Sequence, residues 1–307
     1  MKIGFQLPNI GPVATAEAVV EVAQRAEALG YDSLWTTERV LYPVNPRTPY
    51  PVTPDGSLPE PYKHVLDPVE TLMFAAAHTK KIALGTSVLD MPFYNPVMLA
   101  RRLTTLDVLS NGRLRVGLGL GWSEDEMEAA GGEKKNRGAR ADEFLEILKA
   151  IWTRNPVEYQ GKFYRVPESY IGPKPVQKPH PPIILAAFAP AALNRLARLA
   201  DGWNPVALPP EAMAQMFGAI QQMAKEAGRD PSSLQMIVRA NFGIHDTPLG
   251  KERPMFNGTL EEIREDVMRC REIGAHEIFF DPTFAHGGQS LERWMEWMER
   301  LKKVASS

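Results

Sequence analysis

Short apolar runs alternate with amphipathic stretches along most of this 307-residue chain. Residues 3–7 form the first apolar run, and apolar positions then recur at helical spacing until Gly30, where the helix is expected to end. Further runs of this kind predict strands at 32–36, 82–88, 114–117, 183–187, 202–205, 235–243 and 277–281. Eight strands that alternate with helices predict an α/β fold, and specifically a (β/α)8 TIM barrel rather than a doubly wound sheet.

Capping residues mark several helix starts. Asp67-Pro68 and Asn95-Pro96 each supply a capping side chain followed by proline, a residue suited to the first helical position. The segment 259–262 reads Thr-Leu-Glu-Glu, which has the spacing of a capping box, and Ser123 and Glu126 have the same spacing. We therefore expect helices to begin at these four places.

Two segments interrupt the alternation. Residues 40–66 form a polar, proline-rich loop. A βα loop of this length is usually functional or disordered, and we expect this one to select the substrate. Residues 154–181 form an insertion between strands four and five that is expected to carry a small hairpin. Neither has the size of a second domain, so the chain 1–307 is predicted to be a single barrel domain.

Composition excludes several classes of protein. A formal net charge of -2 supplies no basic surface for nucleic acid, and no apolar run approaches the roughly 18 residues of a membrane span. The single cysteine, Cys270, rules out an internal disulfide and shares an apolar helix face, as a core residue would. The six histidines lack metal-ligand spacing, so no metal is expected, and residues 1–8 lack a signal peptide's apolar region, so we expect a cytoplasmic protein.

Several segments taken together resemble the bacterial luciferase-like monooxygenase superfamily. They are Asp32–Trp35, Leu84–Pro96, Ser110–Trp122 and Leu199–Trp203. The resemblance extends from Phe5 to about Asp281, and Leu84–Val88 with Tyr94-Asn95-Pro96 looks closest to members that use the deazaflavin coenzyme F420. It implies a barrel that holds its cofactor at the carboxyl ends of the strands, where the βα loops of such barrels carry the chemistry.

Glu38 and Arg39 follow the second strand. A carboxylate and a guanidinium at a strand end can hydrogen-bond a heterocycle or a substrate acid, although a solvent-exposed ion pair explains the pair equally well. The resemblance implies an acid followed by histidine at this place. Glu38 keeps the acid, but Arg39 replaces the histidine, and arginine is a poor general base because it stays protonated.

The segment 117–123 follows the fourth strand and carries glycines at alternate positions, including Gly119 and Gly121. Such glycines either let a planar or anionic ligand approach the backbone or close tight turns. The resemblance implies that this segment lines the cofactor and that Trp122 and Glu126 project toward the pocket. Sugar-phosphate dehydrogenases of the family place a glutamate where this chain has Trp122, which favours a more apolar substrate here.

Two further corners are candidates for cofactor binding. Ser87-Val88 reads as a buried strand end, and the resemblance implies a non-proline cis peptide there that supports the back of the ring. Ala186 and Ala187 precede a helix that starts at Pro190, whose amides can bind a phosphate, although close packing also explains the small side chains. A basic run can attract an acidic cofactor tail or form a solvated face; it comprises Lys134, Lys135, Arg137 and Arg140.

These observations predict an F420-dependent oxidoreductase that moves a hydride between the deazaflavin C5 and a small organic molecule. The predicted catalytic residues are Glu38, Arg39 and Trp122. The predicted cofactor-binding residues are Glu38, Ser87, Val88, Gly119, Gly121, Trp122, Glu126, Ala186 and Ala187. Two alternatives are an FMN-dependent monooxygenase, which takes reduced flavin from a separate reductase and uses dioxygen, and a flavin-binding barrel without catalysis. The resemblance also implies a homodimer.

Overall fold

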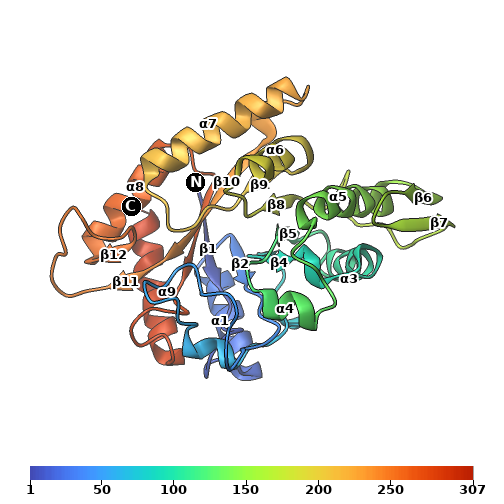
Figure 1. Ribbon diagram of the computed structural model, residues 1–307. Coiled ribbons are helices and arrows are strands. Elements are labelled where there is room, and N and C mark those ends of the chain that lie inside the picture. The colour runs from blue at the N-terminus through green and yellow to red at the C-terminus, as the bar shows by residue number, and fades with distance from the viewer. Residues whose placement is uncertain (307) are drawn as a thin grey trace.

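The computed structural model describes residues 1–306, and its centre is a closed barrel of eight parallel strands (Figure 1). In barrel order the strands are β1 (Lys2–Gln6), β2 (Ser33–Thr36), β3 (Ala83–Thr86), β5 (Leu114–Gly119), β8 (Ile183–Leu185), β9 (Gly202–Trp203), β10 (Gln235–Asn241) and β13 (Glu277–Asp281). The pairings β3–β5 and β1–β13 close the ring. The predicted (β/α)8 barrel is confirmed.

Helices surround the barrel and connect its strands (Figure 1). They are α1 (Ala16–Ala28), α2 (Pro68–His78), α3 (Pro96–Leu109), α4 (Glu124–Ala129), α5 (Arg137–Thr153), α6 (Pro190–Leu199), α7 (Pro210–Glu226), α8 (Leu260–Glu272) and α9 (Leu291–Ser306). Asp67 and Asn95 cap α2 and α3 as predicted, and Thr259 and Glu262 form the predicted capping box of α8. No helix in the described residues is long and apolar enough to cross a membrane.

The predicted strand 82–88 is not continuous. It ends at Thr86, and after the cis peptide Ser87-Val88 a two-residue strand, β4 (Leu89–Asp90), resumes pairing with β5. The cis peptide that the resemblance implied is therefore present. Three other predicted strands also overran their ends: β8 stops before Ala186, β9 has only two residues, and Gly243 leaves β10 for a separate pair of short strands.

The segments between the barrel units are short or irregular. Within residues 154–181, β6 (Val157–Gln160) and β7 (Arg165–Ser169) form an antiparallel hairpin that projects from the side of the barrel (Figure 1). Residues 40–66 contain only the 3-10 turn η1 (Glu60–Lys63), and η2 (Met91–Phe93) follows β4. The remaining short elements are η3 (Pro231–Ser233), β11 (Gly243–Ile244) and β12 (Asn257–Gly258).

The core has two main apolar clusters besides a small one under the 40–66 loop. The larger lies between the strands and the surrounding helices, and it contains Cys270, as predicted. The smaller fills the barrel with Trp35, Ile184, Ile237 and Phe279, and the ring of Trp35 stacks on that of Phe279 at 4.8 Å between centroids. The barrel is therefore a packed solid below its carboxyl end, and only that end is available for a ligand.

Candidate functional site

A layer of polar side chains lies above this apolar plug, at the carboxyl ends of the strands. The backbone oxygen of Ser87 accepts hydrogen bonds from Thr37 Oγ1 and Arg239 Nη1, each at 3.1 Å. The Ser87 hydroxyl donates to Asn204 Oδ1 at 2.6 Å, and Arg239 pairs with the buried Asp281 through its Nε at 2.9 Å. The layer thus joins the residues around the cis peptide to strands on the far side of the barrel.

Several buried polar atoms at this end have no hydrogen-bond partner. Within the described residues there are six such atoms, and all but one belong to side chains that end or follow a barrel strand. Those five are Gln6 Oε1, Arg39 Nε, Trp122 Nε1, Asn241 Oδ1 and Thr283 Oγ1. Buried polar atoms in proteins are almost always partnered, so a cluster of unpartnered ones indicates the place of a polar ligand or of ordered water.

Glu38 is buried beside this layer and is held by Asp90 and Tyr94, which the sequence placed only within a family motif. Its carboxyl group accepts a hydrogen bond from the Asp90 amide at 2.7 Å and one from the Tyr94 hydroxyl. Burial, together with the negative charge of Asp90, raises the pKa of Glu38 to about 8. Glu38 can therefore hold a proton at neutral pH.

Arg39 is buried as well, but it points to other partners. It forms an ion pair with Glu126, and its guanidinium lies over the rings of Tyr62 and Trp122 at 4.9 and 5.0 Å from their centroids. The alternative of a solvent-exposed Glu38–Arg39 ion pair is wrong, because Glu38 is only 6% exposed and only 10% of the Arg39 side chain is exposed. Arg39 thus connects these two aromatic rings to Glu126 of α4.

The Ser123–Glu126 capping box is only half formed. The Ser123 side chain accepts from the Glu126 amide as predicted, but the Glu126 carboxylate turns away from the helix. It accepts from the Val40 amide at 2.8 Å and from Arg39. A buried cation is a stronger partner than a backbone amide, so the tertiary contact prevails over the local one.

The 40–66 loop lies across the mouth of the barrel through these contacts. Arg47 pairs with Asp125 at 2.8 Å, and the Tyr50 ring packs edge-on against Trp122 at 5.4 Å. Tyr62 packs in the same way against Phe284, 5.1 Å away between ring centroids. The loop is thus fastened on one side to α4 and on the other to the segment after β13.

The glycines of 117–121 bring β5 close to the segment around the cis peptide. A Cβ atom on Gly119 would lie 2.6 Å from Val88 Cγ2, and one on Gly117 would lie 1.7 Å from the Thr86 carbonyl oxygen. Gly121 has a φ of +65° and donates its amide to Asp90 Oδ1 at 2.8 Å. These contacts account for the glycines by close packing, and their predicted role in cofactor binding stays a prediction.

Ala186 and Ala187 lie at the carboxyl end of β8, next to the start of α6. This helix has no side-chain cap at its N-terminus, so its first amides lack the partner that a capping side chain would give. Ala187 is buried, and its carbonyl oxygen accepts from Trp203 Nε1 at 2.9 Å. Free amides at a helix start can bind a phosphate, and the use of this corner by a cofactor stays a prediction.

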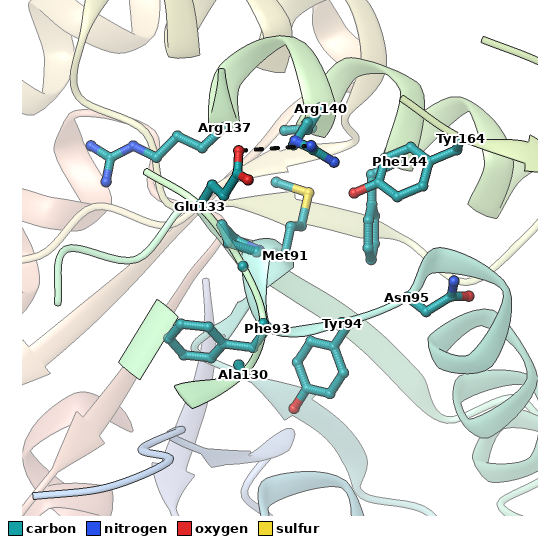
Figure 2. A pocket seen from close by; sticks show the side chains of 14 residues that line it. Met91, Phe93, Tyr94, Asn95, Ala130, Glu133, Arg137, Arg140, Phe144 and Tyr164 are labelled. Atoms are coloured by element: carbon teal, nitrogen blue, oxygen red, sulfur yellow. Dashed lines mark ion pairs between the residues drawn. The ribbon is translucent and has the colours of Figure 1, made fainter. Parts of the chain in front are cut away.

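The basic run divides into two parts. Lys134 and Lys135 are exposed, as a solvated face requires, and Lys134 pairs with Glu124. Arg137 and Arg140 instead line a cavity of about 300 Å³ between η2 and the start of α5. Figure 2 shows Arg140 and Tyr164 facing this cavity across from Phe93 and Tyr94. Arg140 Nε is the sixth buried polar atom without a partner.

Two further cavities open over the barrel mouth, of about 450 and 480 Å³. Both are lined by Val52 from the 40–66 loop and by Asn241 from the end of β10. The described residues contain no group of three or more His, Cys, Asp or Glu side chains that could hold a metal ion.

Residues 3–253 match the model of the family described as luciferase-like monooxygenase, and the chain belongs to this family. An uncharacterized protein of Mycobacterium tuberculosis is 36% identical over 261 residues, which cover 84% of each chain. An F420-dependent glucose-6-phosphate dehydrogenase of Amycolatopsis mediterranei is 31% identical over 209 residues, covering 66% of this chain and 56% of that one. The family places the chain among oxidoreductases.

Other relatives differ in cofactor. An FMNH(2)-dependent dimethylsulfone monooxygenase of Pseudomonas putida is 34% identical over 128 residues, which cover 41% of this chain and 35% of that protein. Among solved structures, a monooxygenase from Streptomyces bottropensis superimposes with a TM-score of 0.81 at 24% identity, over 99% of this chain and 98% of that one. The relatives therefore use F420 or FMN, and the structural likeness concerns the fold.

Proposed function

We propose that this chain is an F420-dependent oxidoreductase that transfers a hydride between the deazaflavin C5 and a small, neutral organic molecule. The observation that carries the proposal is the polar layer with unpartnered buried atoms at the carboxyl ends of the strands. It occurs in a chain that is similar over 66% of its length to an F420-dependent relative. When bound, F420 would supply the hydride acceptor or donor, as deazaflavin and flavin rings do.

The residues present fit this cofactor. The uncapped start of α6 beside Ala186 and Ala187 offers amides to a phosphate group. Arg137 and Arg140 offer positive charge to an acidic tail from the cavity beside α5. The unpartnered Trp122 Nε1 would donate to a polar edge of the ring. The remaining residues proposed to hold the cofactor are Glu38, Ser87, Val88, Gly119, Gly121 and Glu126.

Glu38 is the group that we propose to exchange a proton with the substrate. Its pKa of about 8 lets it donate and accept a proton near neutral pH, which is the property of an effective general acid or base. Arg39 and Trp122 act as positioning residues, because both are engaged in holding the 40–66 loop. The loop then excludes water from the mouth of the barrel.

A sugar phosphate is a poor candidate for the substrate. Arg39 is paired with Glu126, and Arg239 with Asp281, so the charge of each cation at the mouth is already neutralised by a carboxylate. The aromatic residues of the 40–66 loop provide apolar surface instead. Rapid oxidation of glucose 6-phosphate by the F420-loaded protein would contradict this substrate class.

Fluorescence titration of the purified protein with oxidised F420 and with FMN tests the cofactor. We expect a micromolar or lower dissociation constant for F420. The dissociation constant for FMN should be at least about tenfold higher. The variant Arg137→Ala/Arg140→Ala serves as the comparison, and we expect it to weaken F420 binding more than FMN binding. The reverse cofactor preference would make the protein an FMN-dependent monooxygenase, and binding of neither would contradict both assignments.

A further inference from the structure

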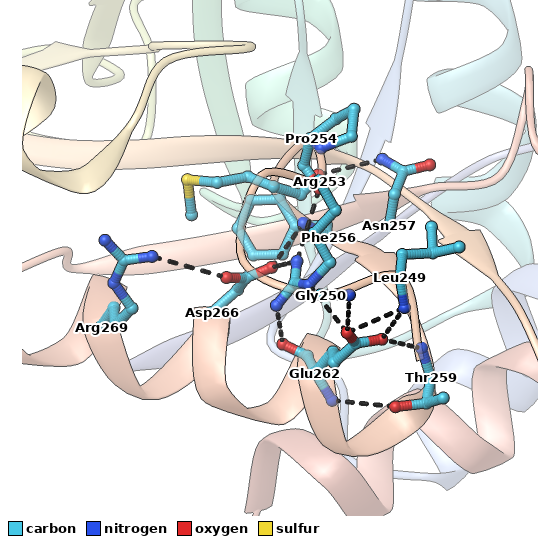
Figure 3. Close-up of polar contacts among 11 residues, drawn as sticks. Leu249, Gly250, Arg253, Pro254, Phe256, Asn257, Thr259, Glu262, Asp266 and Arg269 are labelled. Atoms are coloured by element: carbon cyan, nitrogen blue, oxygen red, sulfur yellow. Dashed lines mark hydrogen bonds and ion pairs between the residues drawn. The ribbon is translucent and has the colours of Figure 1, made fainter. Parts of the chain in front are cut away.

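Most buried carboxyl groups of this chain have partners that favour the charged form. Within the described residues six carboxyl side chains are buried, and four of them form an ion pair with an arginine. These pairs are Glu126–Arg39, Glu277–Arg115, Asp281–Arg239 and Asp266–Arg253, the last of which Figure 3 shows on α8. The fifth carboxylate, Asp107, accepts three hydrogen bonds from the N–H groups of Val176 and Gln177.

Glu38, the sixth, has no such partner. In the part of the chain that the structure describes it forms no ion pair, and its oxygens accept from the Asp90 amide at 2.7 Å and from the Tyr94 hydroxyl. Burial opposes its ionisation, and so do the negative charges of Asp90 and, at the start of α2, of Asp67. The charge that acts most strongly on Glu38 is therefore that of another carboxylate, Asp90.

The Asp90 side chain has a fixed position at the end of β4. Two glycines leave the space for it: a Cβ atom on Gly119 would lie 2.5 Å from Asp90 Oδ1, and the Gly121 amide donates to the same oxygen at 2.8 Å. Among residues 1–306, Asp90 Oδ2 has no hydrogen-bond partner, yet it is not one of the fully buried unpartnered atoms. Because Asp90 is half-buried, this oxygen can be reached by a ligand or by water.

The cations around Asp90 are engaged elsewhere. Arg39 is paired with Glu126, and Arg137 donates through Nη1 to a backbone carbonyl at 2.9 Å. Burial raises the pKa of Asp90 to about 6 in spite of these two arginines, and the charge of Glu126 acts in the same direction as burial. Since burial also raises the pKa of Glu38 to about 8, the two groups together hold one proton between these pH values.

We propose that Glu38 and Asp90 form a buried acid pair that holds one shared proton, and that Asp90 is a positioning residue that determines when Glu38 releases it. Two neighbouring buried carboxyl groups without a cation do not readily ionise together. The proposal rests on the proposed function, in which Glu38 exchanges a proton with the substrate. The pair gives its proton to a molecule that has received a hydride and regains one from a molecule that has lost a hydride, so charge is balanced in both directions.

Infrared spectroscopy across pH tests the acid pair without substrate or cofactor. A protonated carboxyl group has a C=O stretching band that a carboxylate lacks, and the band that is missing in Glu38→Gln belongs to Glu38. In the original protein we expect this band to persist at neutral pH and to disappear with a midpoint of about 8. In Asp90→Asn the Gly121 amide keeps an acceptor but the negative charge is gone, so the midpoint should fall by about one pH unit or more.

Tyr94→Phe should shift the midpoint in the opposite direction. The Tyr94 hydroxyl donates to Glu38 and favours its charged form, so its removal should raise the Glu38 midpoint. Asp107→Asn is the matched control, because it removes another buried carboxylate that has no arginine partner, and it should leave the Glu38 midpoint unchanged. A loss of stability alone would not produce shifts of opposite sign.

Three results would overturn the acid pair: no Glu38 band at neutral pH in the original protein, an unchanged midpoint in Asp90→Asn, or shifts of the same sign in Asp90→Asn and Tyr94→Phe. Asp90→Ser, which also removes the charge and leaves a hydroxyl acceptor, replaces Asp90→Asn if that variant does not fold, with the same expected shift. Failure of F420 to bind in the fluorescence titration would instead contradict the proposed function, since the infrared measurement needs no cofactor.

Discussion

Buried polar groups have hydrogen-bond partners at the amino end of the barrel interior, whereas several lack them at the carboxyl end. At the amino end, Glu277 accepts hydrogen bonds from Ser33, from Trp35 Nε1 at 3.0 Å and from Arg115, with which it forms a buried ion pair. At the carboxyl end, Asn241 and other residues keep buried polar atoms without partners. Polar groups that are satisfied stabilise one structure, whereas unsatisfied ones reduce stability until a ligand meets them.

Two buried glutamates, Glu277 and Glu38, also differ in their partners. Glu277 has the cation of Arg115 beside it, whereas Glu38 is held by the Tyr94 hydroxyl and the Asp90 amide and faces the negative charge of Asp90. In the first arrangement a cation is the partner of the carboxylate. The second suits a carboxyl group that gains and loses a proton, which is useful only where chemistry takes place.

The largest effect should follow from breaking the amino end. In Glu277→Ala the Arg115 cation stays buried without its partner, and Ser33 and Trp35 lose their acceptor. We expect the free energy of unfolding to fall by about 3–5 kcal/mol, measured by urea denaturation. A loss below about 1 kcal/mol would show that this end does not carry the stability that we assign to it.

The next effect concerns pH. Burial raises the pKa of Glu38 to about 8 from its ordinary value of 4.5, so between these pH values the folded chain keeps a proton that the unfolded chain has lost. The free energy of unfolding should therefore fall as pH rises through this window, by up to about 1.4 kcal/mol per unit, and level off outside it. Denaturation of Glu38→Gln measured across the same pH values should lack this component, and parallel curves for the two proteins would disprove it.

The smallest effect should follow from releasing the loop. In Arg39→Met the side chain still fills the space between Tyr62 and Trp122, but Glu126 loses its cation. Because Glu126 keeps the Val40 amide as a donor and the contact fastens one loop, we expect about tenfold faster tryptic cleavage within 40–66 and a smaller loss of stability than in Glu277→Ala. A large drop in the midpoint with unchanged cleavage would show that the ion pair resembles that of Glu277 instead.

Local signals in the sequence account for much of the fold. Asp67 and Asn95 cap their helices because each side chain accepts hydrogen bonds from backbone amides only two and three residues later. Such a contact can be read from the local sequence. Strand ends were less accurate, as at Thr86, because the break at Ser87-Val88 depends on pairing with β5 and not on the local pattern. The barrel was predictable because eight such units close in only a few ways.

The candidate site was predicted less completely, because its contacts join distant parts of the chain. Glu38 and Arg39 were correctly selected as strand-end residues, yet Arg39 meets Glu126 at a separation of 87 positions, which no local pattern encodes. Tyr94 was noted only within a family motif, although it holds Glu38. Asn241 and Thr283 gave no signal at all, since their significance lies in the partners that they lack.

Hydrogen–deuterium exchange with and without F420 tests most directly the claim that the carboxyl end of the barrel is the functional end. The account predicts slower exchange on F420 binding in residues 87–90, 119–126 and 186–193, with no change around Ser33, Arg115 and Glu277. Protection confined to the amino end or to the outer helices would contradict it, even if F420 bound tightly.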